Sequence, residues 1–138
     1  MVQLNPYLRF NGNCREAMTF YQSCLGGELT IQTVGESPAA GQMPPSMQDS
    51  VIHSVLAKDG FVLMASDMTG PEGVKNGDSI TLAIMGSSKA EIEPIFAKLS
   101  AGANVLHPLF EEYFGTFGDL VDKFGIGWMF QAGGNANA

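Results

Sequence analysis

The sequence predicts an α+β fold built from two similar modules, each with one strand, one helix and three further strands. A strand, a polar turn, a capped helix and a closing glycine occur twice, from Asn5 to Gly26 and from Ser79 to Gly102. The period of this repeat exceeds the ~20–50 residues of a solenoid unit, so it indicates two supersecondary modules. We expect a single domain over residues 1–138, with module one at about 1–68 and module two at about 77–132.

The first module opens with a strand followed by a helix. Val2–Phe10 alternates as a strand does, which predicts Asn5, Tyr7 and Arg9 on one face. Asn13 with Glu16 three residues later is a capping-box pattern, so it predicts a helix start. Gly26 and Gly27 predict its end, since glycine accepts the left-handed conformation there.

Three strands complete the first module, interrupted by a long irregular segment. These strands are expected over Glu28–Val34, Ser50–Ala57 and Phe61–Ser66. The segment from Gly35 to Asp49 is rich in proline, glycine and methionine. A loop of that length is typically either a functional lid or disordered, and the sequence leaves its role open.

The second module repeats this order. Ser79–Ile84 predicts a strand, and the Ser88–Glu91 pair is a capping box that opens a helix ending near Ala101 and Gly102. The remaining strands are expected over Asn104–Phe110, Gly115–Val121 and Gly127–Gln131.

The composition excludes several classes of partner. The net charge is −7 and the seven Lys and Arg residues are scattered, so no nucleic-acid partner is expected. No apolar run approaches the ~18 residues of a membrane span, and there is no N-terminal signal pattern, so we expect no membrane partner and a cytoplasmic location.

The two cysteines fall in one predicted helix, about 15 Å apart along its axis, so they are not expected to form a disulfide. Both Cys14 and Cys24 are expected to be reduced helix residues and not nucleophiles, although a position near a helix start, as for Cys14, can lower a thiol pKa.

His53 is the candidate catalytic residue. It lies mid-strand among apolar neighbours, where it either exchanges a proton with a ligand or forms a hydrogen bond in the core or at a sheet edge. Arg9, on the face of Asn5 and Tyr7, either binds a carboxylate or phosphate group or pairs with an acidic residue.

Other candidates lie at strand ends and in the second module. Asp67 either binds a ligand or makes an Asx turn into the next residues. His107 could join Glu112 and His53 in a metal cluster, or be a surface histidine beside acids. Trp128 belongs to an aromatic concentration that suits either a ligand pocket or a core.

Four segments carry a resemblance that covers nearly the whole chain. They are Tyr7–Ala17, Phe20–Gly27, Met64–Asp67 and Gly118–Trp128, the last with an Asp-x-Phe-Gly-x-x-Trp pattern. On these segments the chain resembles the vicinal oxygen chelate superfamily of glyoxalases, bleomycin-resistance proteins and extradiol dioxygenases, and within it the PhnB-like branch.

The resemblance implies curled mixed sheets around a cleft, a homodimer and, in the enzymes, a metal held by His, Gln or Glu. Carried over to this chain, the four ligand positions fall on Asn5, near Leu63, on Ser79 and on Met129. Leucine and methionine cannot bind a hard divalent ion, and asparagine and serine are poor ligands. We therefore expect no metal and no cofactor at these positions.

Three functions remain open, and the sequence does not decide whether the protein is an enzyme. The first is binding of an unidentified small molecule without the superfamily's metal, with Asn5, Tyr7, Arg9, His53, Asp67, Glu112 and Trp128 as candidate binding residues. The alternative is a metal-dependent lyase, isomerase or dioxygenase with a relocated site at His53 and nearby acids. The third follows from the PhnB-like name, which links the chain to phosphonate metabolism or methyl transfer. Against methyl transfer, no glycine-rich strand-to-helix turn for a nucleoside cofactor occurs.

Overall fold

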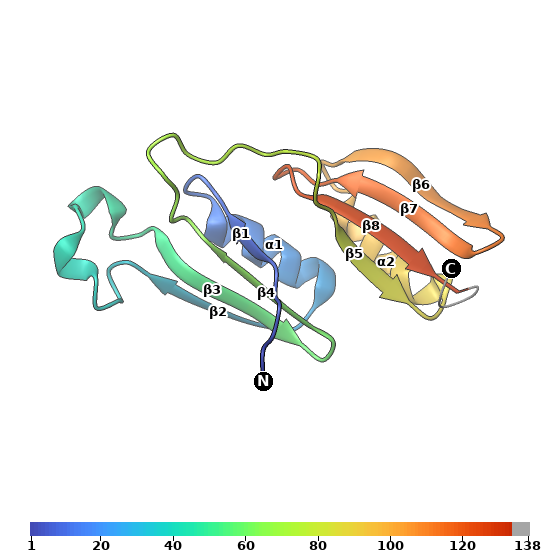
Figure 1. Cartoon of the computed structure of the whole chain (residues 1–138), viewed down its shortest axis with the longest axis horizontal. Helices are drawn as coiled ribbons and strands as arrows, with labels where there is room; N and C mark the ends of the chain where they lie inside the picture. Colours follow the sequence, from blue (N-terminus) through green and yellow to red (C-terminus); the bar gives the residue numbers. More distant parts are fainter. Residues whose placement is uncertain (134–138) are drawn as a thin grey trace. The chain divides into compact units, whose positions relative to one another are not determined.

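The computed structural model describes residues 1–133, and the chain divides into two compact units, Met1–Lys75 and Asn76–Ala138. Each unit holds one helix and one four-stranded sheet (Figure 1). This boundary lies between the two predicted modules.

The first unit contains sheet A and helix α1. Its elements are β1 (Tyr7–Arg9), α1 (Cys14–Leu25), β2 (Glu28–Thr33), β3 (Val51–Lys58) and β4 (Phe61–Ser66). The strand order is β1-β4-β3-β2, with β1 parallel to β4 and the other pairs antiparallel.

The second unit contains sheet B and helix α2. Its elements are β5 (Leu82–Gly86), α2 (Lys89–Leu99), β6 (Asn104–Glu112), β7 (Gly115–Val121) and β8 (Gly127–Ala132). The order β5-β8-β7-β6 and the pairing directions repeat those of sheet A. The predicted α+β fold with two βαβββ modules is therefore confirmed.

Each helix covers one face of its own sheet. The buried face of α1 consists of Ala17, Met18, Tyr21 and Cys24, each at most 4% exposed. In sheet B, Phe96 of α2 meets Phe130 of β8 edge to face, with ring centroids 5.0 Å apart. We call the opposite side of each sheet its helix-free face, because it receives no packing from the helix of its own unit.

The first strand of each unit, β1 and β5, is shorter than predicted, because its hydrogen-bonded ladder with the neighbouring strand begins later in the sequence. In the first unit the strand is Tyr7–Arg9 and not Val2–Phe10, since Pro6 has no N–H to continue the ladder. In the second unit it begins at Leu82 and not at Ser79, because its partner β8 begins only at Gly127. Ser79 therefore lies outside the strand.

The predicted capping bonds are also replaced by others. Ser88 is the residue before α2, but its side chain makes no capping bond. Glu91 instead accepts from the N–H and the hydroxyl of Ser87, at 2.6 and 2.9 Å. These bonds hold the pKa of Glu91 below its usual value.

The long segment between β2 and β3 is a built loop with two short 3₁₀ helices, Ala40–Gln42 and Pro45–Met47. The amide nitrogen of Gln48 donates to the carbonyls of Ala40 and Met43, at 2.9 and 3.1 Å. Side-chain bonds to the backbone thus supply the contacts that a sheet ladder would otherwise make.

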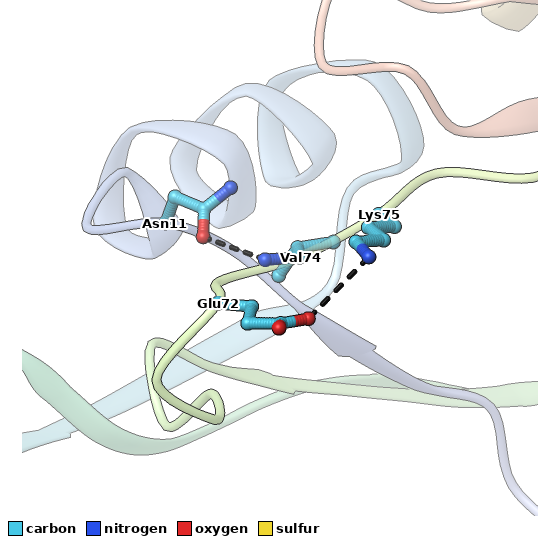
Figure 2. Close-up of polar contacts among 4 residues, drawn as sticks. All are labelled: Asn11, Glu72, Val74 and Lys75. Carbon is cyan, nitrogen blue, oxygen red and sulfur yellow. Dashed lines mark hydrogen bonds and ion pairs between the residues drawn. The ribbon is translucent and has the colours of Figure 1, made fainter.

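The connector after β4 is attached to the first unit almost to its end. The side-chain oxygen of Asn11 accepts from the N–H of Val74 at 2.8 Å (Figure 2). Glu72 and Lys75 form an ion pair of 3.4 Å with both side chains 82% exposed, so this pair adds little stability. The Asn11 contact therefore fixes the connector more firmly than the ion pair does.

Among the described residues, no helix is long and apolar enough to cross a membrane.

Candidate functional site

The helix-free face of sheet A brings Tyr7 and His53 together. Tyr7 lies on β1 and His53 on β3, and β4 runs between them. The Tyr7 hydroxyl lies 3.1 Å from Nδ1 of His53, and the two rings stack with centroids 5.7 Å apart. His53 is therefore hydrogen-bonded, as one alternative predicted, but it lies partly exposed on the interior strand β3 and neither in the core nor at a sheet edge.

Arg9 lies on the same face. It follows Tyr7 by two residues on β1, and side chains two apart on a strand point to the same side. The Arg9 side chain is exposed and forms no ion pair or hydrogen bond with another described residue. Of the two alternatives predicted for Arg9, pairing with an acid is not observed in the described part of the chain. Asn5 lies before β1 and is half-buried.

These three side chains offer a donor-rich surface. The guanidinium presents several N–H donors in a rigid fork, and the hydrogen-bonded Tyr7–His53 pair keeps one further donor when the imidazole is neutral. Such a set matches the oxygens of a carboxylate or a phosphate-like group.

Asp67 has a structural role that the sequence did not indicate. The carboxylate is buried, and Oδ1 accepts from the N–H groups of Gly12 and Cys14, both at 3.0 Å. Oδ2 accepts from the N–H of Val51 at 2.9 Å. The predicted Asx turn is wrong, since Ser66 Oγ accepts from Met68 N–H instead.

The same contacts revise the predicted capping box of the first helix. Asn13 is the residue before α1, but its side chain makes no capping bond. The first helical N–H, that of Cys14, is bound by Asp67 from a distant strand end. A carboxylate near the first turn of a helix also interacts favourably with the positive end of the helix dipole.

Trp128 lies in the core of the second unit. It is 3% exposed, and its indole N–H donates to Oδ2 of Asp122 at 2.8 Å. Oδ1 of Asp122 accepts from the N–H groups of Phe124 and Ile126. The Asp-x-Phe-Gly-x-x-Trp pattern therefore builds a turn, and of the two alternatives for Trp128 the structure shows the core one.

His107 meets an acid that the sequence analysis did not single out. Its Nδ1 lies 2.7 Å from Oδ1 of Asp119 on the neighbouring strand. The predicted partner Glu112 is exposed at the end of β6, where it pairs in register with Gly115. Alternation along β7 could have placed Asp119 on the helix-free face, but the register with His107 depends on irregularities on both sides of His107.

The four ligand positions that the resemblance implies lie on or just before β1, β4, β5 and β8. Leu63 is 3% exposed and pairs with the buried Leu56, so it lies on the covered side of sheet A. By register with Tyr7, the helix-free position there is Met64. In sheet B the corresponding residues are Ala83 and Met129. Within the described residues, no three His, Cys, Asp or Glu side chains come together as a metal site requires.

Cys14 is an inert thiol. It is fully buried, and burial raises its pKa to about 11, although a hydrogen bond with Ser54 opposes that shift. The lowered pKa considered for a thiol near a helix start is therefore wrong, because loss of hydration outweighs the helix terminus.

Comparison with known proteins gives the family. The family model described as 3-demethylubiquinone-9 3-methyltransferase matches residues 2–131. Protein YjdN of Escherichia coli K12 is 32% identical over an alignment of 138 positions, which covers 93% of each chain.

Solved structures agree with this match. Protein PA1353 of Pseudomonas aeruginosa is 36% identical, with 98% of this chain and 100% of that chain covered and a TM-score of 0.84. A Bacillus cereus PhnB protein, titled a putative 3-demethylubiquinone-9 3-methyltransferase, is 26% identical, with coverage of 95% and 99% and a TM-score of 0.74.

A more distant structure shares the fold alone. It is a glyoxalase/bleomycin resistance protein/dioxygenase family enzyme of Burkholderia phytofirmans, 14% identical, with coverage of 91% and 95% and a TM-score of 0.58. The matched residues, the doubled βαβββ topology and these neighbours agree with the resemblance found in the sequence. The chain belongs to the family described as 3-demethylubiquinone-9 3-methyltransferase, in the PhnB-like branch of the vicinal oxygen chelate superfamily.

Proposed function

We propose that this protein binds a small oxyanionic molecule on the helix-free face of sheet A, without the superfamily's usual metal. The observation that carries this proposal is the contact of Tyr7 with His53 beside the unpaired Arg9. Tyr7 and His53 come from two strands that are not neighbours, so the sheet itself fixes their spacing.

The charge of Arg9 supports an anionic ligand. Its guanidinium has no carboxylate partner among the described residues, in a chain with net charge −7. A ligand carboxylate or phosphonate would accept charge-assisted hydrogen bonds from it. The Tyr7–His53 pair would then supply one further donor that selects for oxygen position.

The residues at the family's ligand positions support binding without a metal. Where the superfamily's enzymes carry His, Gln or Glu, the positions carried over to this chain hold Asn5, a residue near Leu63, Ser79 and Met129. A hard divalent ion binds such groups poorly. The alternative of a relocated metal at His53 also lacks an acid in contact with that ring, since the contact described for it is with Tyr7.

We do not extend the methyl transfer in the family's description to this chain. Nucleotide cofactors place phosphates or a ribose at a glycine-rich turn before a helix. Here the turn before α1 has Gly12, and the Asp67 carboxylate already accepts from Gly12 and Cys14. A second negative group at that place would be repelled.

Calorimetric titration with methylphosphonate, inorganic phosphate and benzoate tests the proposal. We expect saturable binding of at least one anion, weakened about tenfold or more in Arg9→Gln, which corresponds to ~1.4 kcal/mol. Arg15→Gln is the matched control, since Arg15 is an exposed arginine on α1 of the same unit. Equal loss in both variants would mean that only net charge matters and would contradict the site.

Metal analysis of protein purified without a histidine tag tests the second part. We expect no stoichiometric zinc, nickel, manganese or iron, and no thermal shift with these ions. A bound metal at one equivalent would contradict the metal-free proposal and favour the enzyme alternative.

A further inference from the structure

The helix-free face of sheet B carries a different set of side chains from that of sheet A. In register across this face lie Ala83, Met129, Asp119 and His107, followed by Met85, Gln131, Phe117 and Phe110. The face therefore combines one histidine–aspartate pair with apolar groups.

The His107–Asp119 pair has a defined proton arrangement. The distance from Nδ1 to Oδ1 is 2.7 Å, and the side chains are 63% and 25% exposed. An ionised carboxylate only accepts hydrogen bonds, so Nδ1 must carry a proton. In the neutral ring Nε2 then has no proton and becomes the acceptor.

The contact with Tyr7 allows His53 to carry its ring proton on the other nitrogen, Nε2. A phenol hydroxyl can donate to Nδ1, which leaves the proton of the neutral ring on Nε2. The two histidines of the chain are thus held by different partners, one by a phenol and one by a carboxylate. With the phenol as donor, the neutral His53 ring offers a donor to a ligand, whereas the neutral His107 ring offers an acceptor.

An apolar platform lies beside the acceptor. The ring centroids of His107 and Phe110 are 6.3 Å apart, and those of Phe110 and Phe117 are 5.7 Å apart with an edge-to-face angle of 67°. Met85 is 60% exposed on the same face. Aromatic and thioether groups favour contact with a flat apolar molecule.

We propose that the His107–Asp119 pair forms a second binding site, which takes a small molecule with a hydroxyl donor on a flat apolar body. The hydroxyl donates to Nε2 of His107, Asp119 holds the ring in the accepting form, and the apolar body packs on Phe110 and Phe117. Asp119 is therefore a positioning residue. This site lies in the second unit and does not depend on the proposed site of sheet A.

Nitrogen-15 NMR of the histidine rings tests the proton arrangement. At mildly alkaline pH we expect neutral His107 with its proton on Nδ1 in the wild type. In Asp119→Ala we expect a mixture of both tautomers. A wild-type His107 with its proton mainly on Nε2 would overturn the proposal.

Titration with phenol and anisole tests the ligand class. The two probes share a ring, but only phenol donates a hydroxyl proton. We expect phenol to shift the His107 ring signals with saturation and to bind several-fold more tightly than anisole. Equal affinity for the two probes, or no shift at His107, would overturn the proposal.

Two variants separate the dyad from the platform. His107→Ala should remove the preference for phenol over anisole and Asp119→Ala should reduce it, and the exposure of His107 makes the first variant safe for folding. Preserved discrimination in either folded variant would overturn the proposal. The His53 signals report separately on sheet A, so failure of one site is distinguishable from failure of the other.

Discussion

Replacing Asp67 by alanine should be among the most destabilising single changes at a polar residue of the first unit. The change removes one carboxylate that accepts three backbone N–H groups from two separate segments. These bonds join the start of α1, the start of β3 and the end of β4. The substitution therefore tests whether this buried carboxylate connects the unit.

The expected loss of unfolding free energy follows from how deeply each of the three N–H donors is buried. The Cys14 and Val51 residues are 0% and 1% exposed, so their N–H groups would lose an acceptor with no water in its place. Each unsatisfied buried donor costs about 1–3 kcal/mol. The Gly12 N–H is part-buried and can turn to water. We expect a loss of about 3–4 kcal/mol, against a typical total of about 5–15 kcal/mol.

Urea unfolding followed by circular dichroism measures this loss. With a slope of about 2 kcal/mol per molar urea, the midpoint should fall by roughly 1.5–2 M with little change in slope. Asp67→Asn should lose less stability, because one side-chain oxygen remains to accept hydrogen bonds. Its NH₂ group, however, would face a backbone N–H and could not accept from it. Asp49→Ala is the control, since Asp49 is exposed in the same unit.

A small effect would refute this reasoning. Exposed substitutions usually change stability within about 0.5 kcal/mol. If Asp67→Ala lay within that range of Asp49→Ala, the three bonds would not carry the connection. If it instead abolished anion binding while stability stayed unchanged, Asp67 would be a ligand residue.

Three further predictions address the core, the pH response and assembly. Because the pKa of Cys14 rises from 9.0 to about 11 on folding, the stability that this thiol contributes is complete below pH 9.0 and is lost as pH rises towards 11. Two pKa units correspond to at most about 2.7 kcal/mol, and urea unfolding of Cys14→Ala should lack this alkaline loss. Trp128→Phe removes the indole donor to Oδ2 of Asp122 and should cost about 1–3 kcal/mol by the same assay; a loss below that range would contradict a stabilising role for this bond. The family resemblance predicts a homodimer, so light scattering should give twice the chain mass of 14.7 kDa, and a monomer at micromolar concentration would contradict it.

Local turn chemistry explains why many elements could be predicted from the sequence. Phe61–Ser66 and Gly115–Val121 were predicted with their observed bounds, since a glycine in a left-handed turn, Gly60 or Gly115, marks where each begins. The end of α1 at Leu25 was predicted for the same reason, with Gly26 at φ +76°. Where a strand end depends on its partner, as for Leu82, the prediction erred by three residues.

Other contacts of the candidate site join residues far apart in the chain, so they could not be predicted from the sequence. The placement of Tyr7 and Arg9 on one face follows from alternation, but the Tyr7–His53 contact requires the strand order β1-β4-β3. The role of Asp67 depends on N–H groups up to 55 residues away. The His107–Asp119 pair depends on two register shifts, one between Val105 and His107 and one between His107 and Phe110.

The most direct test of the sheet A site uses the fact that the chain has two histidines, one on each sheet. Their ring proton signals can be assigned with His107→Gln and followed during a titration with methylphosphonate. We predict a saturable shift of the His53 signals, lost in Arg9→Gln, with the His107 signals unchanged. A titration in which His53 stays unmoved while other signals saturate would contradict the proposed site.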